Sequence, residues 1–258
     1  MNLGKNDLKK KLKDNVQTYG CWVTISHPLI PEILAPAYFD WLVVDMEHSS
    51  IDLNNLLSII ISVEKNEMVP LVRVGENNAN LIKRVMDSGA YGVIIPNICN
   101  ADDVIRALNA VKYPPSGTRG VGLYRAQGYG KKFDEYLQWL ESESVVIVQI
   151  EHIDAVQNID DIFSVPGIDA FIIGPYDLSG SMGKPGKFDN DEVQEAIGKV
   201  LQAGKKYGVP AGFHSVSSDP KEAMKYKNKG FKFLGFSLDS IFLGDAAISA
   251  MDMLKKPS

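Results

Sequence analysis

The sequence contains few cysteines and no long hydrophobic run. Its 258 residues include two cysteines, Cys21 and Cys99, and neither belongs to a CxxC or Cys/His pattern, which argues against a disulfide framework or a zinc site. No apolar stretch approaches the roughly 18 residues that a membrane span needs. The basic start of the chain lacks the apolar core of a secretory signal. We therefore expect no membrane contact and a reducing, cytoplasmic setting.

Basic charge and phosphate-binding motifs are also scarce. The net charge is −5 and the lysines are scattered, so no basic stripe is present and nucleic acid is not an expected partner. The glycine-rich segment 114–122 has no GK[ST] ending, and no GxGxxG follows the first predicted strand, which excludes a P-loop and a Rossmann site. Lysines such as Lys184 and Lys232 do not stand at predicted strand ends, which disfavours a Schiff-base aldolase.

Eight short apolar runs are present instead, at spacings typical of a barrel. Their hydrophobicity is nearly continuous, as in parallel strands that are buried on both faces. Segments with helical period separate them; in residues 80–87 the apolar side chains fall on one face. The alternation predicts one (β/α)8 barrel as a single domain over residues 1–258, with an N-terminal helix; a doubly wound open sheet is the alternative. The predicted strands are 19–25, 41–46, 69–74, 91–98, 145–151, 169–174, 209–215 and 231–237.

Helix boundaries and one long insertion can also be predicted. Asn100 or Asp102 is expected to begin one helix and the segment Ser218-Asp219-Pro220 another, and glycines such as Gly208 stand where a helix must stop before the next strand. Residues 113–144 are too long for a plain connection and carry their own helical pattern. Because long loops in compact domains are often functional, this segment is a candidate lid.

Polar residues follow several predicted strands, where a barrel places its active site. Glu151 and Asp177 follow adjacent strands, and their hard oxygen donors suit Mg²⁺ or Mn²⁺; the alternative is that they are isolated polar residues at loop starts. Arg73 ends a core strand and should face a carboxylate of the protein or of a substrate. His48 follows Asp45 and Glu47, which could orient it for proton transfer, although a lone histidine there is more often structural. His27, His152 and His214 are expected to be bystanders.

These residues and their order closely resemble the HpcH/HpaI family of class II pyruvate aldolases. That family includes the 2,4-dihydroxyhept-2-ene-1,7-dioate, 2-dehydro-3-deoxyglucarate and 2-keto-3-deoxy-L-rhamnonate aldolases. The resemblance extends from about residue 19 to residue 245, and the combination of motifs is more specific than any one of them. It rests on residues 39–48 (FDWLVVDMEH), Arg73, 113–122 (YPPSGTRGVG), 149–151 (QIE) and 173–183 (IGPYDLSGSMG).

The resemblance implies a barrel of the phosphoenolpyruvate/pyruvate-domain type and an enzyme that reversibly cleaves a 4-hydroxy-2-oxo acid to pyruvate and an aldehyde. A divalent metal ion, Mg²⁺ or Mn²⁺ with Co²⁺ as a further candidate, would stabilise a pyruvate enolate. Glu151 and Asp177 match the metal ligands of the family and Arg73 matches the arginine that contacts pyruvate. His48 matches the histidine of proton transfer, and Asp45 matches its supporting carboxylate.

Other positions match the family less directly. Gln149 falls at a polar position near the substrate, and the backbone N–H groups of Tyr176 and Asp177 match those that hold the pyruvate carboxylate. Asp87 matches an aspartate of the acid–base network that acts across a subunit interface. Met46 and Asn97 depart from the residues common in relatives, which implies a changed acceptor pocket.

The resemblance also implies a homo-oligomer, a hexamer in which C-terminal helices after residue 240 are exchanged between subunits. Two rival functions stay open from the sequence. One is a related enolate-forming lyase that acts on an acyl-CoA or a phosphoenolpyruvate-type substrate. The other is a barrel that binds a metabolite without turnover. The sequence does not identify the aldehyde, the preferred metal or the physiological direction.

Overall fold

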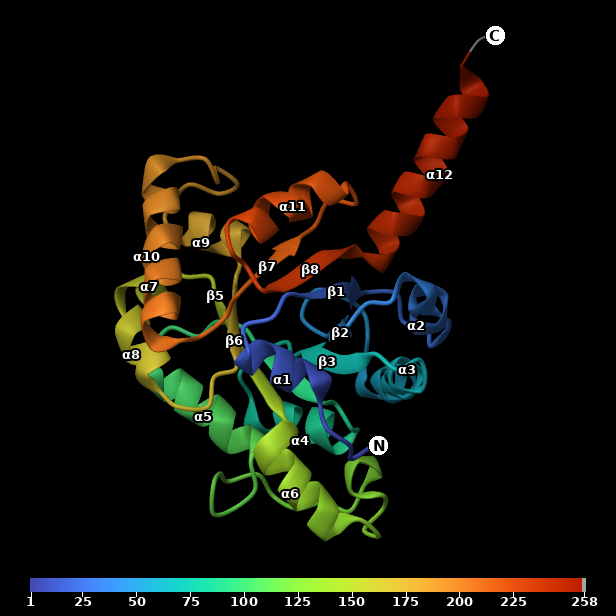
Figure 1. Cartoon of the computed structure of the whole chain (residues 1–258), viewed down its shortest axis with the longest axis vertical. Helices are drawn as coiled ribbons and strands as arrows, with labels where there is room; N and C mark the ends of the chain where they lie inside the picture. Colours follow the sequence, from blue (N-terminus) through green and yellow to red (C-terminus); the bar gives the residue numbers. More distant parts are fainter. Residues whose placement is uncertain (257–258) are drawn as a thin grey trace.

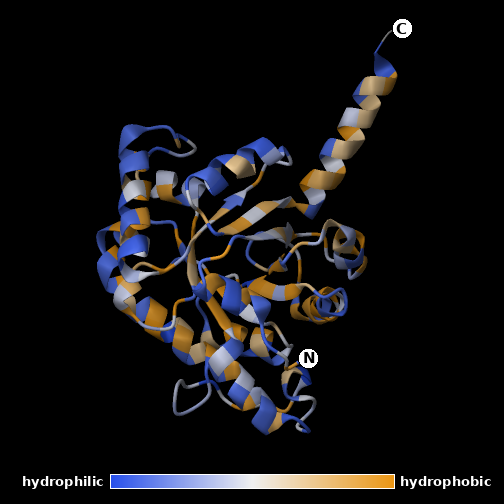
Figure 2. Cartoon of the chain, viewed as in Figure 1, coloured by the Kyte–Doolittle hydropathy of each residue, from blue (hydrophilic) through white to orange (hydrophobic). Residues whose placement is uncertain are grey.

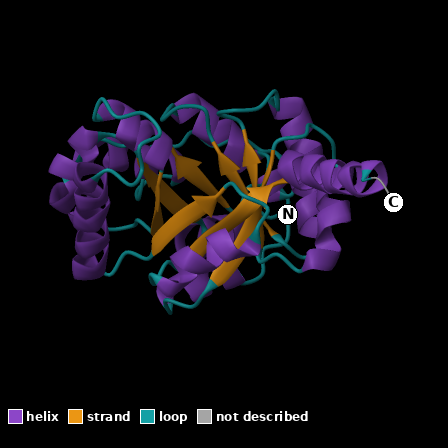
Figure 3. Cartoon of the chain, turned by 90° about the horizontal axis from the view of Figure 1, so that it is seen from above, coloured by secondary structure: helices purple, strands orange, loops and turns teal. Residues whose placement is uncertain are grey.

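The eight apolar runs of the sequence form eight parallel strands that close into a barrel. The computed structural model describes residues 1–256, and in it β1 pairs with both β2 and β8, with Thr18 opposite Phe233. The barrel prediction is thereby confirmed and the open-sheet alternative is wrong; Figure 3 shows the strands enclosed by helices. The strands are β1 (Thr18–Val23), β2 (Trp41–Asp45), β3 (Val69–Arg73), β4 (Gly92–Ile95), β5 (Val145–Ile150), β6 (Ala170–Ile173), β7 (Ala211–Ser215) and β8 (Phe233–Leu238).

Large aromatic rings fill the interior of the barrel between β1, β2 and β8. Trp41 stacks on Phe233 with ring centroids 4.0 Å apart, and Trp22 meets Trp41 edge to face at 5.8 Å. Gly20 is required beside them, because a Cβ atom at this position would lie 2.0 Å from the Trp41 ring. This packed layer supports the site above it, since close-packed interiors allow little movement.

Helices surround the barrel, and several of them begin at side-chain caps that could be predicted from the sequence. Asn100 accepts the N–H of Asp103 at the start of α5, and Asp219 accepts that of Lys221 at the start of α11, both as predicted. Gly208 ends α10 in the left-handed conformation. The helices, labelled in Figure 1, are α1 (Asp7–Lys13), α2 (Leu29–Leu34), η1 (Ala35–Ala37), α3 (Leu53–Lys65), α4 (Ala79–Asp87), α5 (Ala101–Val111), η2 (Arg125–Gln127), α6 (Phe133–Glu143), α7 (Ile153–Gln157), α8 (Ile159–Ser164), α9 (Pro175–Ser181), α10 (Asp191–Tyr207), α11 (Pro220–Asn228) and α12 (Asp239–Lys255).

The predicted N-terminal helix, α1, lies at the amino ends of the strands. Leu8 and Leu12 are buried in the core, and Lys9 pairs with Asp169, just before β6, at 2.6 Å. The Lys9 ammonium also donates to the carbonyl of Ser144, just before β5, at 2.9 Å. Because α1 covers this end of the barrel, the opposite end, where the strands terminate, is the one open to substrate.

Residues 113–144 do not form a lid over this end of their own barrel. They contain η2 and the predicted helix α6, and they connect α5 to the start of β5, so they lie at the amino ends of the strands. Trp139 of α6 donates to the carbonyl of Gly4 at 2.9 Å, which ties the segment to the N-terminal stretch. The lid hypothesis is wrong for the isolated chain because the chain order puts this insertion opposite the strand ends.

Helix α12 projects away from the barrel (Figure 1) and carries apolar bands along its length (Figure 2). Its first residue, Asp239, is buried, whereas Leu243, Ile248, Met251, Met253 and Leu254 are exposed. No helix within residues 1–256 is long and apolar enough to cross a membrane.

Candidate active site

Strands β2 and β3 place an acid and a base side by side at their carboxyl ends. Asp45 and Arg73 lie opposite each other in the strand register. The guanidinium donates to both carboxylate oxygens, from Nε to Oδ1 at 3.0 Å and from Nη2 to Oδ2 at 2.6 Å. Both side chains are largely buried. Arg73 therefore faces a protein carboxylate, one of the two alternatives that the sequence left open, and its orientation is fixed before any ligand arrives.

Glu47 is the second carboxylate beside Arg73, and the only role predicted for it was to orient His48. Its Oε2 lies 3.2 Å from Arg73 Nη1, yet this buried oxygen has no hydrogen-bond partner among residues 1–256. Burial raises the pKa of Glu47 to about 7; Glu151, Asp45 and Asp177 add to the rise and Arg73 opposes it. An acid with this pKa exchanges its proton near neutral pH.

His48 stands at the mouth of the barrel with its side chain 65% exposed. Its Nε2 is 3.9 Å from Oε2 of Glu47. Asp45 was expected to support the imidazole, but its carboxylate bonds to the backbone instead. Oδ1 accepts the backbone N–H groups of Glu47 at 3.0 Å and His48 at 3.3 Å. Asp45 thus orients the loop that carries His48, and Glu47 is the carboxylate near the ring.

Glu151 follows β5 and is held at both carboxylate oxygens. Oε1 accepts the backbone N–H of Asn97 at 2.7 Å, and Oε2 accepts the amide of Gln149. The residue is 4% exposed, and burial raises the pKa of its carboxyl, with a further rise from Asp177, while the two hydrogen bonds oppose the shift. Gly174 leaves room for this carboxylate, because a Cβ atom there would lie 2.9 Å from Oε2.

Negative charge exceeds positive charge at this end of the barrel. Glu151, Asp45 and Asp177 all lie close enough to raise the pKa of Glu47, and Arg73 is the cation among them. Such an excess fits a bound cation, and carboxylate oxygens are the donors that Mg²⁺ and Mn²⁺ prefer. Within residues 1–256 no group of three or more His, Cys, Asp or Glu side chains is arranged to hold a metal, and the assignment of Glu151 and Asp177 as ligands stays a prediction.

Two predicted site residues lie apart from this cluster within one chain. Asp87 ends α4, at the opposite end of the barrel, and pairs with Arg119, whose guanidinium lies 4.7 Å from the ring centre of Tyr113. The Tyr176 ring is exposed and packs edge to face on Phe188 at 4.6 Å. The backbone N–H of Tyr176, however, lies in the first turn of α9, where helical N–H groups have no acceptor within the helix.

The other histidines have structural surroundings. His152 caps α7 by accepting the N–H of Asp154, and the imidazole of His214 stacks on Trp22 with ring centroids 4.0 Å apart. Burial lowers the pKa of His214 to about 4, so this ring is neutral near pH 7. Its Nε2 is 3.0 Å from the carbonyl of Ser237.

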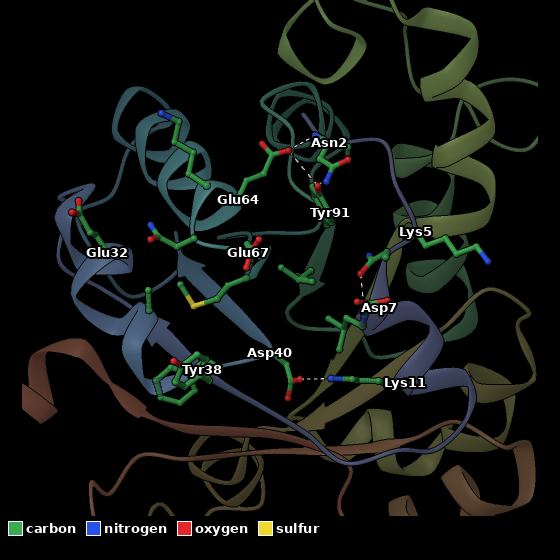
Figure 4. A pocket seen from close by; sticks show the side chains of 18 of the residues that line it. Asn2, Lys5, Asp7, Lys11, Glu32, Tyr38, Asp40, Glu64, Glu67 and Tyr91 are labelled. Atoms are coloured by element: carbon green, nitrogen blue, oxygen red, sulfur yellow. Dashed lines mark hydrogen bonds and ion pairs between the residues drawn. The ribbon is translucent and has the colours of Figure 1, made fainter.

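A hollow lies at the other end of the barrel, between α1, η1 and α3 (Figure 4). It has a volume of about 1000 Å³. Some of its charged groups are paired within the protein: Lys11 with Asp40, and Glu64 with Arg125 and the hydroxyl of Tyr91. The carboxylates around Arg73 lie at the opposite end, where a barrel places its active site, and the candidate site is assigned there.

Comparison with known proteins gives a consistent result. The family model described as HpcH/HpaI aldolase/citrate lyase matches residues 18–245. A hydroxypyruvate/pyruvate aldolase of Paraburkholderia phytofirmans is 34% identical over 99% of this chain and 100% of the relative. A 5-keto-4-deoxy-D-glucarate aldolase of an Enterobacter species is 32% identical over 97% of each chain. The crystal structure of an HpcH/HpaI aldolase/citrate lyase family protein from Burkholderia cenocepacia superimposes with a TM-score of 0.92 at 33% identity, covering 98% of this chain and 100% of that one.

Proposed function

Because the chain belongs to the HpcH/HpaI aldolase/citrate lyase family, we propose that it is a metal-dependent aldolase that reversibly cleaves a 4-hydroxy-2-oxo acid to pyruvate and an aldehyde. The observation that carries the proposal is the convergence of Glu151, Asp177 and the pre-oriented Arg73 at one end of the barrel. The relatives that are known as aldolases favour an aldolase over a lyase that acts on an acyl-CoA or a phosphoenolpyruvate-type substrate, and over a barrel without turnover.

Glu151 and Asp177 would hold the metal ion, for which Mg²⁺, Mn²⁺ and Co²⁺ are the candidates. When bound, such an ion supplies positive charge that stabilises an enolate oxygen. Gln149 and the backbone N–H of Asn97 keep Glu151 in place for this role. The N–H groups of Tyr176 and Asp177, in the first turn of α9, would bind the pyruvate carboxylate.

Arg73 would bind the pyruvate oxygens and offset the charge that develops when a proton leaves C3. Its bidentate contact with Asp45 fixes the guanidinium in advance, so little reorganisation is needed during the reaction. His48 would accept the C3 proton in the condensation direction and deliver a proton to the aldehyde oxygen. Glu47, 3.9 Å from the imidazole, would stabilise the imidazolium that forms.

The assembly that we propose is a homo-oligomer, with a hexamer as the specific expectation. The exposed apolar side chains of α12 support it, because they find no cover within the described part of their own chain. In such an assembly Asp87, which lies far from the strand ends of its own barrel, could serve the site of a neighbour. We also propose a single domain over residues 1–258 and a cytoplasmic location. The free thiols of Cys21 and Cys99 support that location, because a reducing compartment keeps thiols unpaired.

Deuterium exchange into the methyl group of pyruvate tests the enolate half-reaction without knowledge of the aldehyde. In D₂O with Mn²⁺ or Mg²⁺, NMR should show exchange that disappears when a chelator is added. Glu151→Ala and Asp177→Ala should abolish it, whereas Glu195→Ala, an exposed carboxylate of α10, should leave it unchanged. Exchange at the wild-type rate in either of the first two variants would contradict the ligand assignment. No exchange in folded wild type with metal would contradict the proposed function.

A further inference from the structure

The backbone at the end of β4 adopts an unusual conformation where it meets Glu151. Asn97 has φ +55°, in the left-handed region that residues other than glycine seldom occupy, with asparagine the best tolerated among them. Its N–H donates to Oε1 of Glu151 at 2.7 Å, while its side chain is exposed. The contact with Glu151 is therefore made by the backbone, and the side chain determines how well that backbone conformation is tolerated.

The chain on the far side of Asn97 cannot easily move to relieve the left-handed conformation. Cys99 donates its N–H to Oδ2 of Asp103 at 2.9 Å, and its carbonyl accepts the Asn158 amide at 3.0 Å. Ile98 between them is buried. These contacts hold the residues after Asn97 in place. A change of φ at Asn97 would therefore rotate the preceding peptide group, which carries its N–H, and would turn this donor away from Glu151.

We infer that Asn97 is a positioning residue, whose left-handed backbone holds the Glu151 carboxylate in the orientation needed to bind the metal ion. The inference rests on the proposed function, because it presupposes that Glu151 is a ligand. The carboxylate is confined on three sides: by Asn97 from β4, by Gln149 from β5, and by Gly174 after β6, where a Cβ atom would lie 2.9 Å from it. Groups that orient a ligand in this way commonly change metal affinity 10- to 100-fold when they are lost.

The test is the affinity of the full-length chain for Mn²⁺, measured by titration calorimetry without substrate. Asn97→Val, which disfavours the left-handed region, should weaken binding roughly 10-fold or more. Asn97→Gly retains the N–H and tolerates positive φ, so it should bind within about twofold of wild type. If the valine variant does not fold, Asn97→Ala gives the same test with less strain, with an intermediate loss expected.

Asn15 provides a matched control, because it is also an asparagine with a left-handed backbone, φ +53°, but follows α1 at the other end of the barrel. Asn15→Val should lower thermal stability and leave Mn²⁺ affinity unchanged. Wild-type affinity in folded Asn97→Val would overturn the inference. Equal losses in the glycine and valine variants would overturn it as well, since the side chain would then be the active group. Absence of Mn²⁺ binding in the wild type would instead refute the proposed function together with this inference.

Discussion

At the scale of single residues, the buried carboxyl group of Glu47 makes the stability of the fold depend on pH. Without metal, the raised pKa of about 7 means that the folded protein keeps a proton that the unfolded chain, near its ordinary value of 4.5, has already lost. The folded state therefore binds more protons between these two values, and stability must fall as the pH rises through this window. Above about pH 7 the buried carboxylate is ionised and lowers the free energy of unfolding, whereas below pH 4.5 it is protonated and this loss is absent.

Glu47→Gln should remove this dependence, because an amide cannot ionise. Urea unfolding of metal-free protein should show that the variant gains stability relative to wild type as the pH rises. The gain between pH 4.5 and pH 7.5 should be roughly 1–2 kcal/mol. This is less than the full pKa shift implies, because the site is partly solvated. Glu195→Gln, at an exposed position, should follow the wild-type profile. Parallel profiles for wild type and Glu47→Gln would show that Glu47 ionises normally.

Arg73 should not tolerate a lysine, although the charge is conserved. A lysine cannot reproduce the two parallel contacts with Asp45, whose carboxylate is buried and would lose a partner. We expect a loss of about 1–3 kcal/mol of stability and a fall of about 100-fold in the rate of pyruvate exchange. Arg84→Lys, on the exposed side of α4, should change neither. A variant that exchanges normally but binds the aldehyde poorly would assign Arg73 to the acceptor instead.

At the scale of elements, the junction of β8 and α12 holds the loop that follows β1. The buried carboxylate of Asp239 accepts the N–H groups of Thr24 at 3.0 Å and Ile25 at 2.9 Å, and the Thr24 hydroxyl at 2.7 Å. Asp239→Asn should cost about 1–3 kcal/mol and accelerate amide hydrogen exchange in residues 24–27. Asp252→Asn, exposed on the same helix, serves as the control. Unchanged exchange in this loop would mean that it is held by other contacts.

The elements were predictable from the sequence because strands buried on both faces leave continuous apolar runs, and caps such as Asn100 and Asp219 mark helix starts. The site cluster was predictable for a related reason: the fold brings strand ends such as Asp45, Arg73 and Glu151 to one face. The pairing of Arg73 with Asp45 depends on the register between β2 and β3, and the left-handed conformation of Asn97 depends on its backbone angles. Neither can be read from a local sequence pattern. The position of residues 113–144 could have been inferred from chain order alone.

At the scale of the whole molecule, the exposed apolar side chains of α12 bear on the proposed assembly. Burial of each large apolar side chain contributes about 1.5–3 kcal/mol, so covering Leu243, Ile248 and Met251 against another subunit would stabilise an oligomer strongly. Ile248→Asp should therefore dissociate the proposed assembly, as measured by light scattering after gel filtration, whereas Ser164→Asp, at an exposed position of α8, should not. An oligomer that survives Ile248→Asp would refute this role of α12.

The same variant tests whether one barrel is a complete catalyst. Asp87 lies at the opposite end from the carboxylate cluster of its own chain, so it can act in proton transfer only if a neighbour presents it. If that is its role, subunits dissociated by Ile248→Asp should bind Mn²⁺ with wild-type affinity but exchange pyruvate protons far more slowly, and Asp87→Asn in the intact oligomer should slow exchange to a similar degree. Full exchange by dissociated subunits would restrict Asp87 to its structural pairing with Arg119 and confine the chemistry to the strand ends of a single chain.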